Sequence, residues 1–430
     1  MSARIKLTAV VCCTLWLVAS AVAATRVFKG EDLHVDGGAL QKGSNKYTLR
    51  AIEVPELAKP GLAKPDIMAA LNRLADAGAS CALIELSGVS ESGRSISDEG
   101  KQIVRTLCES VNGRHMGVVC RVFGPNAPDT ERYRKRVAKA AAKAFRDTRQ
   151  VLFLFDGPHS KEAVRIFHRY APMVATIAPE GGDMILATAP VQVPKKPVVL
   201  LGALPEVMTE DAHVILPAGD ASYASLDKAC ADPRESQPWT PDNSSLTEQE
   251  RAEGWIALFD GKTKNGWVVL GDENAWEVRD GVLQRIAAGS RGLRSIERYG
   301  DFVLRWEWCL PEGGNNGVHL RAPRVARASR IGIEYQMLGD FGKAPDKNST
   351  GSIYDVVPPT ENAVKPNGEW NTSEVTLSGT HVKYVLNGVT VQDLDMNDNE
   401  DLRPRLRKGF IVLTEHSSVV KYRSIRLKKL

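Results

Sequence analysis

The chain has 430 residues, which favours two domains, and its content of 43% hydrophobic and 25% charged residues is ordinary for a globular protein. The formal net charge is +4, and no long basic stripe with interleaved aromatic residues appears, which argues against a nucleic-acid partner. Beyond the first residues no segment is long and apolar enough to cross a membrane, so we expect no stable membrane span.

Residues 1–24 have the pattern of a cleaved export signal. Arg4 and Lys6 form a short positive start, and a mostly apolar run follows over 7–18. A small-x-small motif ends at Ala23, where we expect cleavage. A membrane anchor is the alternative, but the run is too short to span a bilayer comfortably. The sequence therefore predicts a secreted or periplasmic protein.

Five cysteines follow the predicted signal, and their spacing matches no zinc motif. They are Cys81, Cys108, Cys120, Cys230 and Cys309. An exported protein can form disulfides, but an odd number leaves at least one thiol free. Cys81 and Cys120 lie in apolar, strand-like runs, so we expect buried free thiols there.

The region from 25 to 230 alternates between short apolar segments and helical patterns, after a turn-rich start. The predicted strands are 48–54, 81–86, 117–123, 151–155, 173–178, 184–187, 198–201 and 213–216. The predicted helices are 65–78, 97–112, 129–147, 160–170 and 221–230. This repetition indicates a parallel sheet covered by helices, and eight strands favour a degenerate (β/α) barrel. An open doubly wound sheet is the alternative, because the last units have little room for full helices.

Four acidic residues lie at or near the carboxyl ends of these predicted strands: Glu53, Glu85, Asp156 and Glu180. That edge carries the active sites of barrel enzymes. The opening of the region also weakly resembles the start of glycosidase barrels, and a glycosidase needs two carboxylates in register. Helix caps and ion-pair partners are the alternative, and the sequence gives no way to pair the four acids.

Residues 231–246 are rich in Pro, Ser and Asp and carry no periodicity. The pattern changes abruptly across this segment, from strand–helix repetition to strand–turn repetition. We therefore expect a mobile linker between two separate domains, at 25–230 and 247–430, since each half is long enough to bury its own core.

From Trp255 onward, short strands alternate with turns such as Asp280-Gly281 and Asn387-Gly388. This rhythm is typical of an all-β sandwich. Strand side chains alternate between the two faces of a sheet. His319 and Arg321 are therefore predicted to share one polar face, and Glu334 and Gln336 to continue that face on a neighbouring strand. Together they suit the floor of a sugar-sized site.

Several segments of this second half follow one another in the order of a known family. They are Trp255-Ile256-Ala257-Leu258-Phe259-Asp260-Gly261, Trp276-Glu277-Val278, Tyr299-Gly300-Asp301-Phe302, Asn315-Asn316-Gly317-Val318-His319-Leu320-Arg321, Gly332-Ile333-Glu334-Tyr335-Gln336-Met337, Thr350-Gly351-Ser352-Ile353-Tyr354, Gly368-Glu369-Trp370-Asn371 and Gly409-Phe410-Ile411-Val412-Leu413. Over about 250–430 the chain resembles the 3-keto-disaccharide hydrolase domain family, whose members are akin to concanavalin-type lectins and glucanases. The resemblance implies a jelly-roll sandwich that acts on glycosides oxidised to a 3-ketone.

The chain departs from the family pattern at two places. Members commonly carry Asp after the Gln-bearing strand as Glu-x-Gln-x-x-Asp, whereas here Asp340 comes one position later. Where Gln-Asp-His is usual near the end, this chain has Thr414-Glu415-His416. These departures keep open a different class of function, a non-catalytic glycan-binding sandwich attached to a degenerate glycosidase-like barrel.

A 3-ketone acidifies the hydrogen at C2, and removal of that proton lets the C1 substituent leave. The chemistry needs a base, a group that stabilises the enolate, and an acid. We expect Glu334 or His319 as the base, Arg321 or a divalent metal ion in the enolate role, and His416 as the acid.

The oligosaccharide or glycoside substrate is expected to contact a further set of polar and aromatic residues. This set is Gln336, Asn316, Asp340, Tyr354, Trp370 and Asn371. A polar, solvated sheet face is the alternative for the strand residues, and core packing is the alternative for Trp370.

Overall fold

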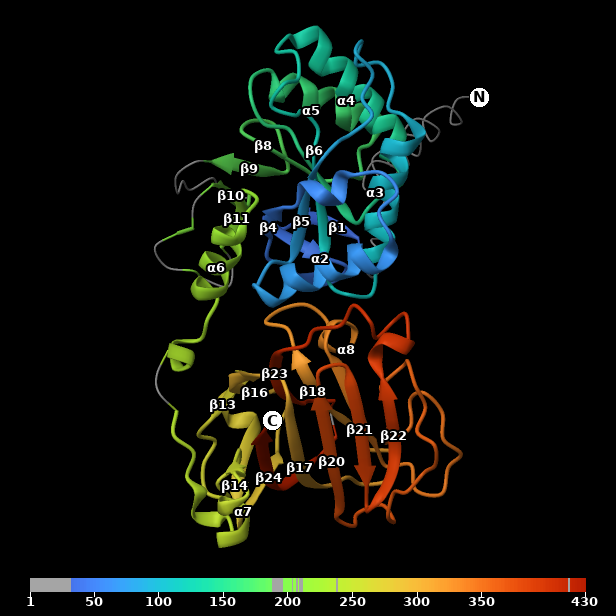
Figure 1. Cartoon of the computed structure of the whole chain (residues 1–430). Helices are drawn as coiled ribbons and strands as arrows, with labels where there is room; N and C mark the ends of the chain where they lie inside the picture. Colours follow the sequence, from blue (N-terminus) through green and yellow to red (C-terminus); the bar gives the residue numbers. More distant parts are fainter. Residues whose placement is uncertain are drawn as a thin grey trace, which may run out of the picture.

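The computed structural model describes residues 32–187, 196–202, 204–205, 208, 212–236, 239–416 and 418–430. The predicted export signal lies outside the described residues. Figure 1 shows two bodies, a helix-covered barrel formed by the first half of the chain and a sandwich of long strands formed by the second half.

The first half contains a closed barrel of eight parallel strands, in the spatial order β10-β11-β4-β5-β6-β7-β8-β9. Its strands are β4 (Arg50–Glu53), β5 (Cys81–Glu85), β6 (Gly117–Arg121), β7 (Val151–Leu154), β8 (Thr176–Ala178), β9 (Met184–Ala187), β10 (Val198–Leu201) and β11 (His213–Leu216). All eight predicted strands are present, so the barrel prediction is confirmed and the open sheet is wrong. Parallel strands need apolar groups on both faces, which explains their near-continuous Val, Leu and Ile runs.

Helices cover the outside of the barrel. They are η1 (Pro55–Ala58), α2 (Lys64–Asp76), α3 (Asp98–Val111), α4 (Glu131–Phe145), α5 (Ser160–Tyr170) and α6 (Asp220–Ala229). Side-chain caps fix two of the starts, because the hydroxyl oxygens of Ser97 and Thr130 accept hydrogen bonds from the first turns of α3 and α4. Only residues 179–183 separate β8 from β9, so this connection has no room for a helix.

A short antiparallel sheet closes one end of the barrel. It consists of β1 (Leu33–Asp36), β2 (Ala39–Lys42) and β3 (Asn45–Lys46). Leu33 and Leu40 are buried in the same apolar cluster as the inward-facing barrel residues Leu83 and Val119. The backbone N–H of Leu33 donates to the carbonyl of Arg149, 2.7 Å away, which ties the sheet to the start of β7.

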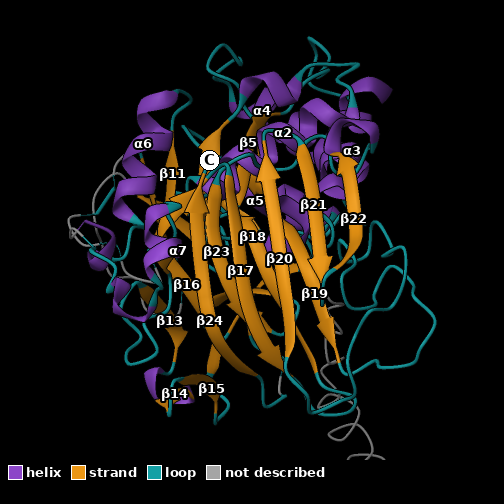
Figure 2. Ribbon diagram, turned by 60° about the horizontal axis from the view of Figure 1, so that its bottom comes forward, coloured by secondary structure: helices purple, strands orange, loops and turns teal. Residues whose placement is uncertain are grey.

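The second half is a sandwich of two antiparallel sheets, which confirms the predicted fold (Figure 2). The larger sheet has the order β14-β15-β24-β17-β20-β21-β22 with β12 beside β24, and the smaller has the order β13-β16-β23-β18-β19. The strands are β12 (Ile256–Ala257), β13 (Trp267–Gly271), β14 (Trp276–Arg279), β15 (Val282–Arg285), β16 (Ser290–Tyr299), β17 (Phe302–Cys309), β18 (Asn315–Ala322), β19 (Ile333–Leu338), β20 (Asn371–Ser378), β21 (His381–Leu386), β22 (Val389–Asp395), β23 (Gly409–Thr414) and β24 (Lys421–Lys429). Short helices are η2 (Pro233–Ser236), η3 (Asn243–Ser245), α7 (Glu248–Ala252), η4 (Glu273–Ala275), α8 (Ala328–Ile331) and η5 (Met396–Asp398).

Large aromatic side chains fill the space between the two sheets. Trp306 and Tyr335 meet edge to face with ring centroids 5.0 Å apart, and Tyr335 and Tyr384 are equally close. The hydroxyl of Tyr335 accepts a hydrogen bond of 2.9 Å from Ser373, so burial of this ring leaves its polar end satisfied.

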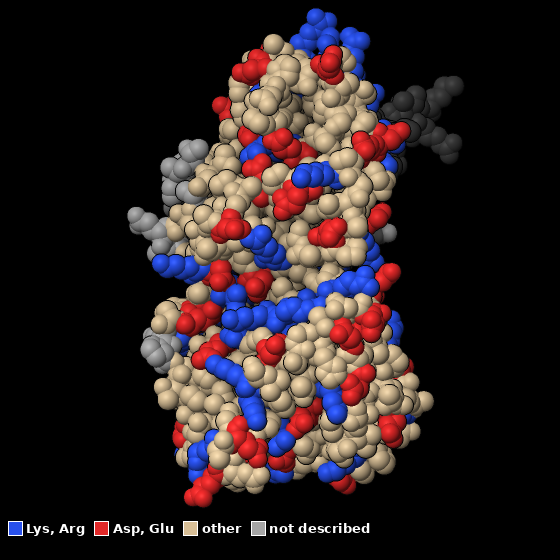
Figure 3. Space-filling model, in the orientation of Figure 1, with Lys and Arg blue, Asp and Glu red and all other residues tan. Residues whose placement is uncertain are grey.

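The sandwich packs on the barrel through the loops before β19 and before β23. Ile331 is part of the apolar cluster around the barrel strands, and Val325 N–H donates to the carbonyl of Ala75 at the end of α2. Asn72, also on α2, donates to the carbonyl of Pro404. These contacts are at the carboxyl ends of barrel helices, and therefore at the amino-terminal edge of the parallel strands. Figure 3 shows Lys and Arg side chains gathered where the two bodies meet.

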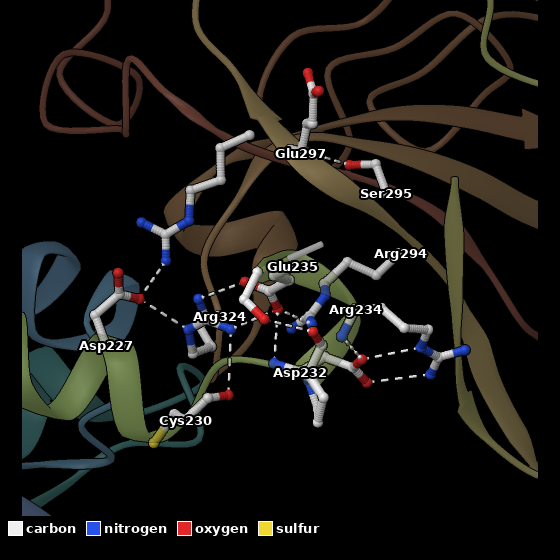
Figure 4. Close-up of polar contacts among 12 residues, drawn as sticks. Asp227, Cys230, Asp232, Arg234, Glu235, Arg294, Ser295, Glu297 and Arg324 are labelled. Carbon is white, nitrogen blue, oxygen red and sulfur yellow. Dashed lines mark hydrogen bonds and ion pairs between the residues drawn. The ribbon is translucent and has the colours of Figure 1, made fainter. Parts of the chain in front are cut away.

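The predicted linker is anchored at η2, where the sequence predicted a mobile connection. Glu235 lies 2.5 Å from Arg294 and 2.8 Å from Arg324, both on the sandwich (Figure 4). All three side chains are buried or nearly so, with exposed fractions of 12%, 9% and 4%. A composition rich in Pro and Ser does not reveal such an ion pair, because its partners are far away in sequence.

The five cysteines of the described part of the chain are free thiols, and Cys81, Cys108 and Cys120 are buried. Burial raises the pKa of Cys108 to about 12, so this thiol stays protonated and unreactive at neutral pH. Within the described residues, no helix combines the length and apolar character that a membrane crossing requires.

Candidate functional site

The polar face predicted from strand alternation lies on the smaller sheet, where β18 pairs with β19. Val318 lies opposite Tyr335, and both point into the sandwich core. The next pair along the ladder is His319 opposite Glu334, so alternation turns these two side chains to the outer face. The sequence prediction is confirmed for this pair of positions.

His319 and Glu334 form a close pair on that face. The distance from His319 Nε2 to Glu334 Oε2 is 3.3 Å. The carboxylate is 5% exposed and the imidazole 18% exposed, so the imidazole is the more accessible of the two groups. A carboxylate beside one ring nitrogen orients the imidazole and fixes which nitrogen carries the hydrogen.

Gly317 leaves space for the Glu334 carboxylate beside His319. No role for Gly317 was predicted from the sequence. A Cβ atom at position 317 would lie 2.5 Å from Glu334 Oε1 and 3.2 Å from Glu334 Cγ. Any side chain there would push the carboxylate aside. The signal was present in the sequence, as a glycine inside an otherwise well-formed strand, which often marks a close approach.

Gln336 continues the face one pleat beyond Glu334. Its Nε2 donates to Asn315 Oδ1 at 3.2 Å, and the backbone N–H of Asn315 donates to Ser418 Oγ at 3.0 Å. The second bond brings the loop after β23 beside the start of β18. His416 belongs to this loop and is exposed to solvent. Asn315 was absent from the predicted site, although it is the first residue of the motif that contains His319.

The loop that carries His416 is held by an ion pair. Arg285 Nε lies 2.5 Å from Glu415 Oε1, and both side chains are largely buried. Glu415 therefore supports the position of its neighbour.

Tyr354 borders the same face from the other side. Its backbone N–H donates to the carbonyl of Glu334 at 3.0 Å, and Ile353 forms a bridge with Tyr335. The segment around Tyr354 thus extends the sheet beyond β19. Asp355 follows in a left-handed conformation with φ of 60° and pairs with Lys347 and Arg330. A hydrogen bond from Lys347, and the charge of Arg330, keep the pKa of Asp355 below its usual range.

Arg321 does not join this face, contrary to the sequence prediction. The pairing of β18 with β23 shifts register between His319 and Ala322, and Arg321 has φ of 51°. This bulge interrupts the alternation. The fully buried guanidinium donates to the carbonyls of Gly300 and Gly379 and to Asp301, at 2.8, 2.9 and 2.9 Å. Arg321 therefore ties turns of the two sheets together.

Asn316 and Asp340 are also structural in their contacts. Asn316 is fully buried, and its Oδ1 accepts from Tyr422 and Thr414 at 2.9 and 3.0 Å. Alternation places it inward with Val318, so its assignment to the substrate face was wrong. Asp340 accepts from the N–H and hydroxyl of Thr350 at 3.0 and 2.8 Å, which closes the loop after β19.

Trp370 and Asn371 lie at the start of β20, in the larger sheet, and not beside His319. The guanidinium of Arg423 stacks over the Trp370 ring at 4.0 Å, so this ring face is covered. Asn371 Oδ1 accepts from Lys365 N–H at 2.9 Å and from Asn387 Nδ2 at 2.7 Å. Both residues serve the packing of the 363–371 loop.

The face around His319 extends across the smaller sheet to the interdomain contacts. The ladder registers place Arg294, Val412, His319 and Glu334 in one row across β16, β23, β18 and β19. Neighbouring strands are about 4.8 Å apart, so Arg294 and His319 are roughly 10 Å apart on one face. Glu235 pairs with this arginine, so η2 borders the candidate site on the barrel side.

Across the described ranges, no group of three or more His, Cys, Asp and Glu side chains is arranged to hold a metal ion.

Residues 254–428 match the model of the 3-keto-alpha-glucoside-1,2-lyase-like domain, which confirms the resemblance derived from the sequence motifs. A 3-keto-disaccharide hydrolase of Bacteroides thetaiotaomicron is 26% identical over 231 residues, a match that covers 42% of this chain and 79% of the relative. The described barrel lies outside the matched range.

Among solved structures, the chain is similar to a protein of Parabacteroides distasonis described as a glycosyl hydrolase. It is 26% identical, with a TM-score of 0.39, and the match covers 43% of this chain and 98% of that one. The carbohydrate-binding module CBM66 of Bacillus subtilis is 13% identical, with a TM-score of 0.29, over 38% of this chain and 96% of the module.

Proposed function

We propose that the protein is an exported carbohydrate-active enzyme whose sandwich cleaves 3-keto-glycosides by removing the proton at C2. The observation that carries the proposal is the His319–Glu334 pair, 3.3 Å apart on the outer face of the smaller sheet. The similarity to 3-keto-disaccharide hydrolases supports this substrate class. Export rests on the signal pattern of residues 1–24.

In this proposal His319 is the base and Glu334 its positioning partner. An Nε2–H directed at Glu334 leaves the lone pair on Nδ1, which takes the C2 proton. The C2–H electrons form the enolate, and the C1–O bond then breaks with its electron pair leaving on the aglycone oxygen. Glu334 stabilises the imidazolium that results. Water can add to the unsaturated sugar afterwards, which completes a hydrolysis.

The other polar groups have assigned places in this reaction. Gln336 uses one amide hydrogen toward Asn315, and we assign its second to the ketone or enolate oxygen. His416, on the exposed loop beside Asn315, protonates the leaving oxygen. Arg321 takes no part, since its guanidinium is occupied elsewhere.

Turnover of a 3-keto-glucoside by the full chain tests the proposal, with the variants His319→Ala and Glu334→Gln. The chain supplies a matched control in His381, whose Nε2 lies 2.7 Å from Asp393 Oδ1 on the other sheet. We expect the first two variants to lose turnover and His381→Ala to retain it. Equal activity in all three would remove the assignment.

A binding-only sandwich is the second candidate function. Two acids near the positions of the family motif favour this candidate, because both already interact within the protein. Asp340 accepts a hydrogen bond from Thr350, and Glu415 forms an ion pair with Arg285. Saturable glycan binding without release of sugar or aglycone from any oxidised substrate would support this candidate over the enzyme.

A further inference from the structure

A cavity at the carboxyl edge of barrel strands β5 and β6 contains Glu85, one of the four acids that the sequence places at this edge, and lies outside the proposed site of the sandwich. Its volume is about 170 Å³. It is on the side of the barrel opposite to the edge that contacts the sandwich. The residues that line it are Glu85, Leu86, Val89, Val122, Phe123, Gly124, Pro125, Asn126, Ala127, Tyr133 and Val137.

Glu85 is the only charged side chain among these lining residues. The neighbouring acids of the barrel mouth are ion-paired, because Arg121 lies 3.0 Å from both Glu53 and Asp156. The Glu85 carboxylate, by contrast, takes part in no hydrogen bond or ion pair with any other residue that the structure describes. A half-buried carboxylate requires hydrogen-bond donors, which solvent or a ligand must then supply.

Gly124 keeps this carboxylate open to the cavity. A Cβ atom at position 124 would lie 3.1 Å from Glu85 Oε2 and 3.5 Å from its Cδ, so a larger side chain would cover the group. The backbone does not demand glycine here, since Gly124 is not among the residues with positive φ. Access to Glu85 therefore depends on Gly124. This observation is independent of the first one, that the Glu85 carboxylate has no hydrogen-bond or ion-pair partner among the described residues.

We propose that this cavity is a second carbohydrate site, which binds one neutral pyranose ring. The two oxygens of Glu85 accept hydrogen bonds from adjacent ring hydroxyls, since an ionised carboxylate is a pure acceptor. Tyr133 and the aliphatic walls contact the apolar C–H faces of the ring. The choice of a sugar among polyhydroxyl ligands rests on the proposed function of the sandwich. The site itself does not, because it lies in a different domain.

Calorimetric titration of the full chain with the methyl glycosides of glucose, galactose and mannose tests the proposal. We expect saturable, millimolar binding of at least one glycoside. Glu85→Gln and Gly124→Val should each weaken it tenfold or more, the first through a lost acceptor and the second by steric cover. Gly124→Ala provides a milder variant if valine prevents folding.

Two further variants separate this site from the sandwich. Glu99→Gln changes an acid that lines another barrel cavity, and Glu334→Gln changes the proposed catalytic pair. We expect Glu99→Gln to bind the glycoside as the parent chain does, and Glu334→Gln to keep the part of the binding that Glu85→Gln removes. The proposal is overturned if no glycoside binds, if Glu85→Gln and Gly124→Ala both bind normally, or if only Glu334→Gln abolishes binding. The last result would move the sugar to the sandwich and leave its proposed function intact.

Discussion

His319 and Arg321 are two positions apart on β18, yet within the described part of the chain they contact different partners. His319 faces Glu334 on the outer side of the smaller sheet, whereas Arg321 reaches Gly379 in a turn of the other sheet. The bulge between His319 and Ala322 separates them. Gly409 and Gly332 pack against this bulge so closely that a Cβ at either would lie within 2.6 Å of the Arg321 backbone. Arg321, a polar residue of the family motif, therefore stabilises the fold of the sandwich.

Arg321→Ala should unfold the sandwich more easily without a specific effect on chemistry. Its removal takes the guanidinium from the carbonyls of Gly300 and Gly379, and a buried carbonyl left unsatisfied costs about 1–3 kcal/mol. Asp301 is 44% exposed and still accepts a hydrogen bond from the backbone N–H of Gly379, so it adds little to this cost. Chemical denaturation should report this loss. Under conditions where the variant is still folded, we expect turnover of the 3-keto-glucoside to fall far less than in His319→Ala.

His319→Ala should reduce kcat/KM for a 3-keto-glucoside by about 10²–10⁴-fold, the usual contribution of a general base. Glu334→Gln should lower kcat with little change in KM, because the carboxylate acts through the imidazole. His381→Ala should leave the rate within about twofold, and the melting temperatures of all three should be compared with that of the parent chain. A Glu334→Gln variant that changed only KM would contradict the positioning role.

Glu235→Gln should loosen the two domains and expose the 239–246 segment to protease. The variant leaves Arg294 and Arg324 without their shared carboxylate, and we expect a loss of roughly 2–4 kcal/mol in the domain contact. Limited proteolysis should cut the variant sooner than the parent chain. Equal rates of cutting would show that the apolar contacts around Ile331 suffice.

The stabilisation by Glu235 should depend on pH. Burial opposes its charge, but hydrogen bonding to Arg324 and the charges of both arginines outweigh this and lower the pKa of Glu235. A folded pKa below the unfolded value of about 4.3 means that the stabilisation is present above that pH and disappears as the pH falls through the folded pKa. Burial raises the pKa of Asp76 nearby, but Asp76 titrates in both proteins. The difference in unfolding free energy between parent and Glu235→Gln should therefore be constant near neutrality and vanish in acid.

Asp340→Ala should release the loop between β19 and Thr350. The carboxylate accepts two hydrogen bonds from Thr350, and leaving them unmade costs about 1–3 kcal/mol. Asp340→Asn, which keeps one acceptor oxygen, should recover part of that stability. If Asp340→Asn instead abolished turnover in a fully stable protein, Asp340 would belong to the reaction.

Regular periodicity made most of the fold predictable from the sequence. The eight barrel strands are short apolar runs separated by helical patterns, so counting them was enough. The alternation that places Val318 inside also places His319 outside, and this prediction needed no structure. The motif resemblance predicted the jelly-roll sandwich, but the order of its strands comes from the structure.

The errors share a physical cause, which is contact between residues distant in sequence. Alternation could not anticipate the bulge at Arg321, where φ is positive and where Gly332 and Gly409, both distant from it in sequence or on another strand, pack against the backbone. Glu235 lies in the segment predicted to be a mobile linker, but its partners are 59 and 89 residues away. Asn371 was predicted to contact the substrate, and only the fold reveals that Lys365 and Asn387 donate hydrogen bonds to its side-chain oxygen.

The anchoring of η2 has a practical consequence for anyone who divides this protein into fragments. A truncated sandwich that begins after residue 246 lacks Glu235 and Asp227, and so carries Arg294, Arg298 and Arg324 around Phe410 with no counter-charge from the first half. Three guanidinium groups on one aromatic ring would collect sulfate, phosphate or acidic polymers from the buffer. Retention of such a fragment on an anionic glycan column would then report the cut surface, about 10 Å from the histidine whose ligand the experiment seeks.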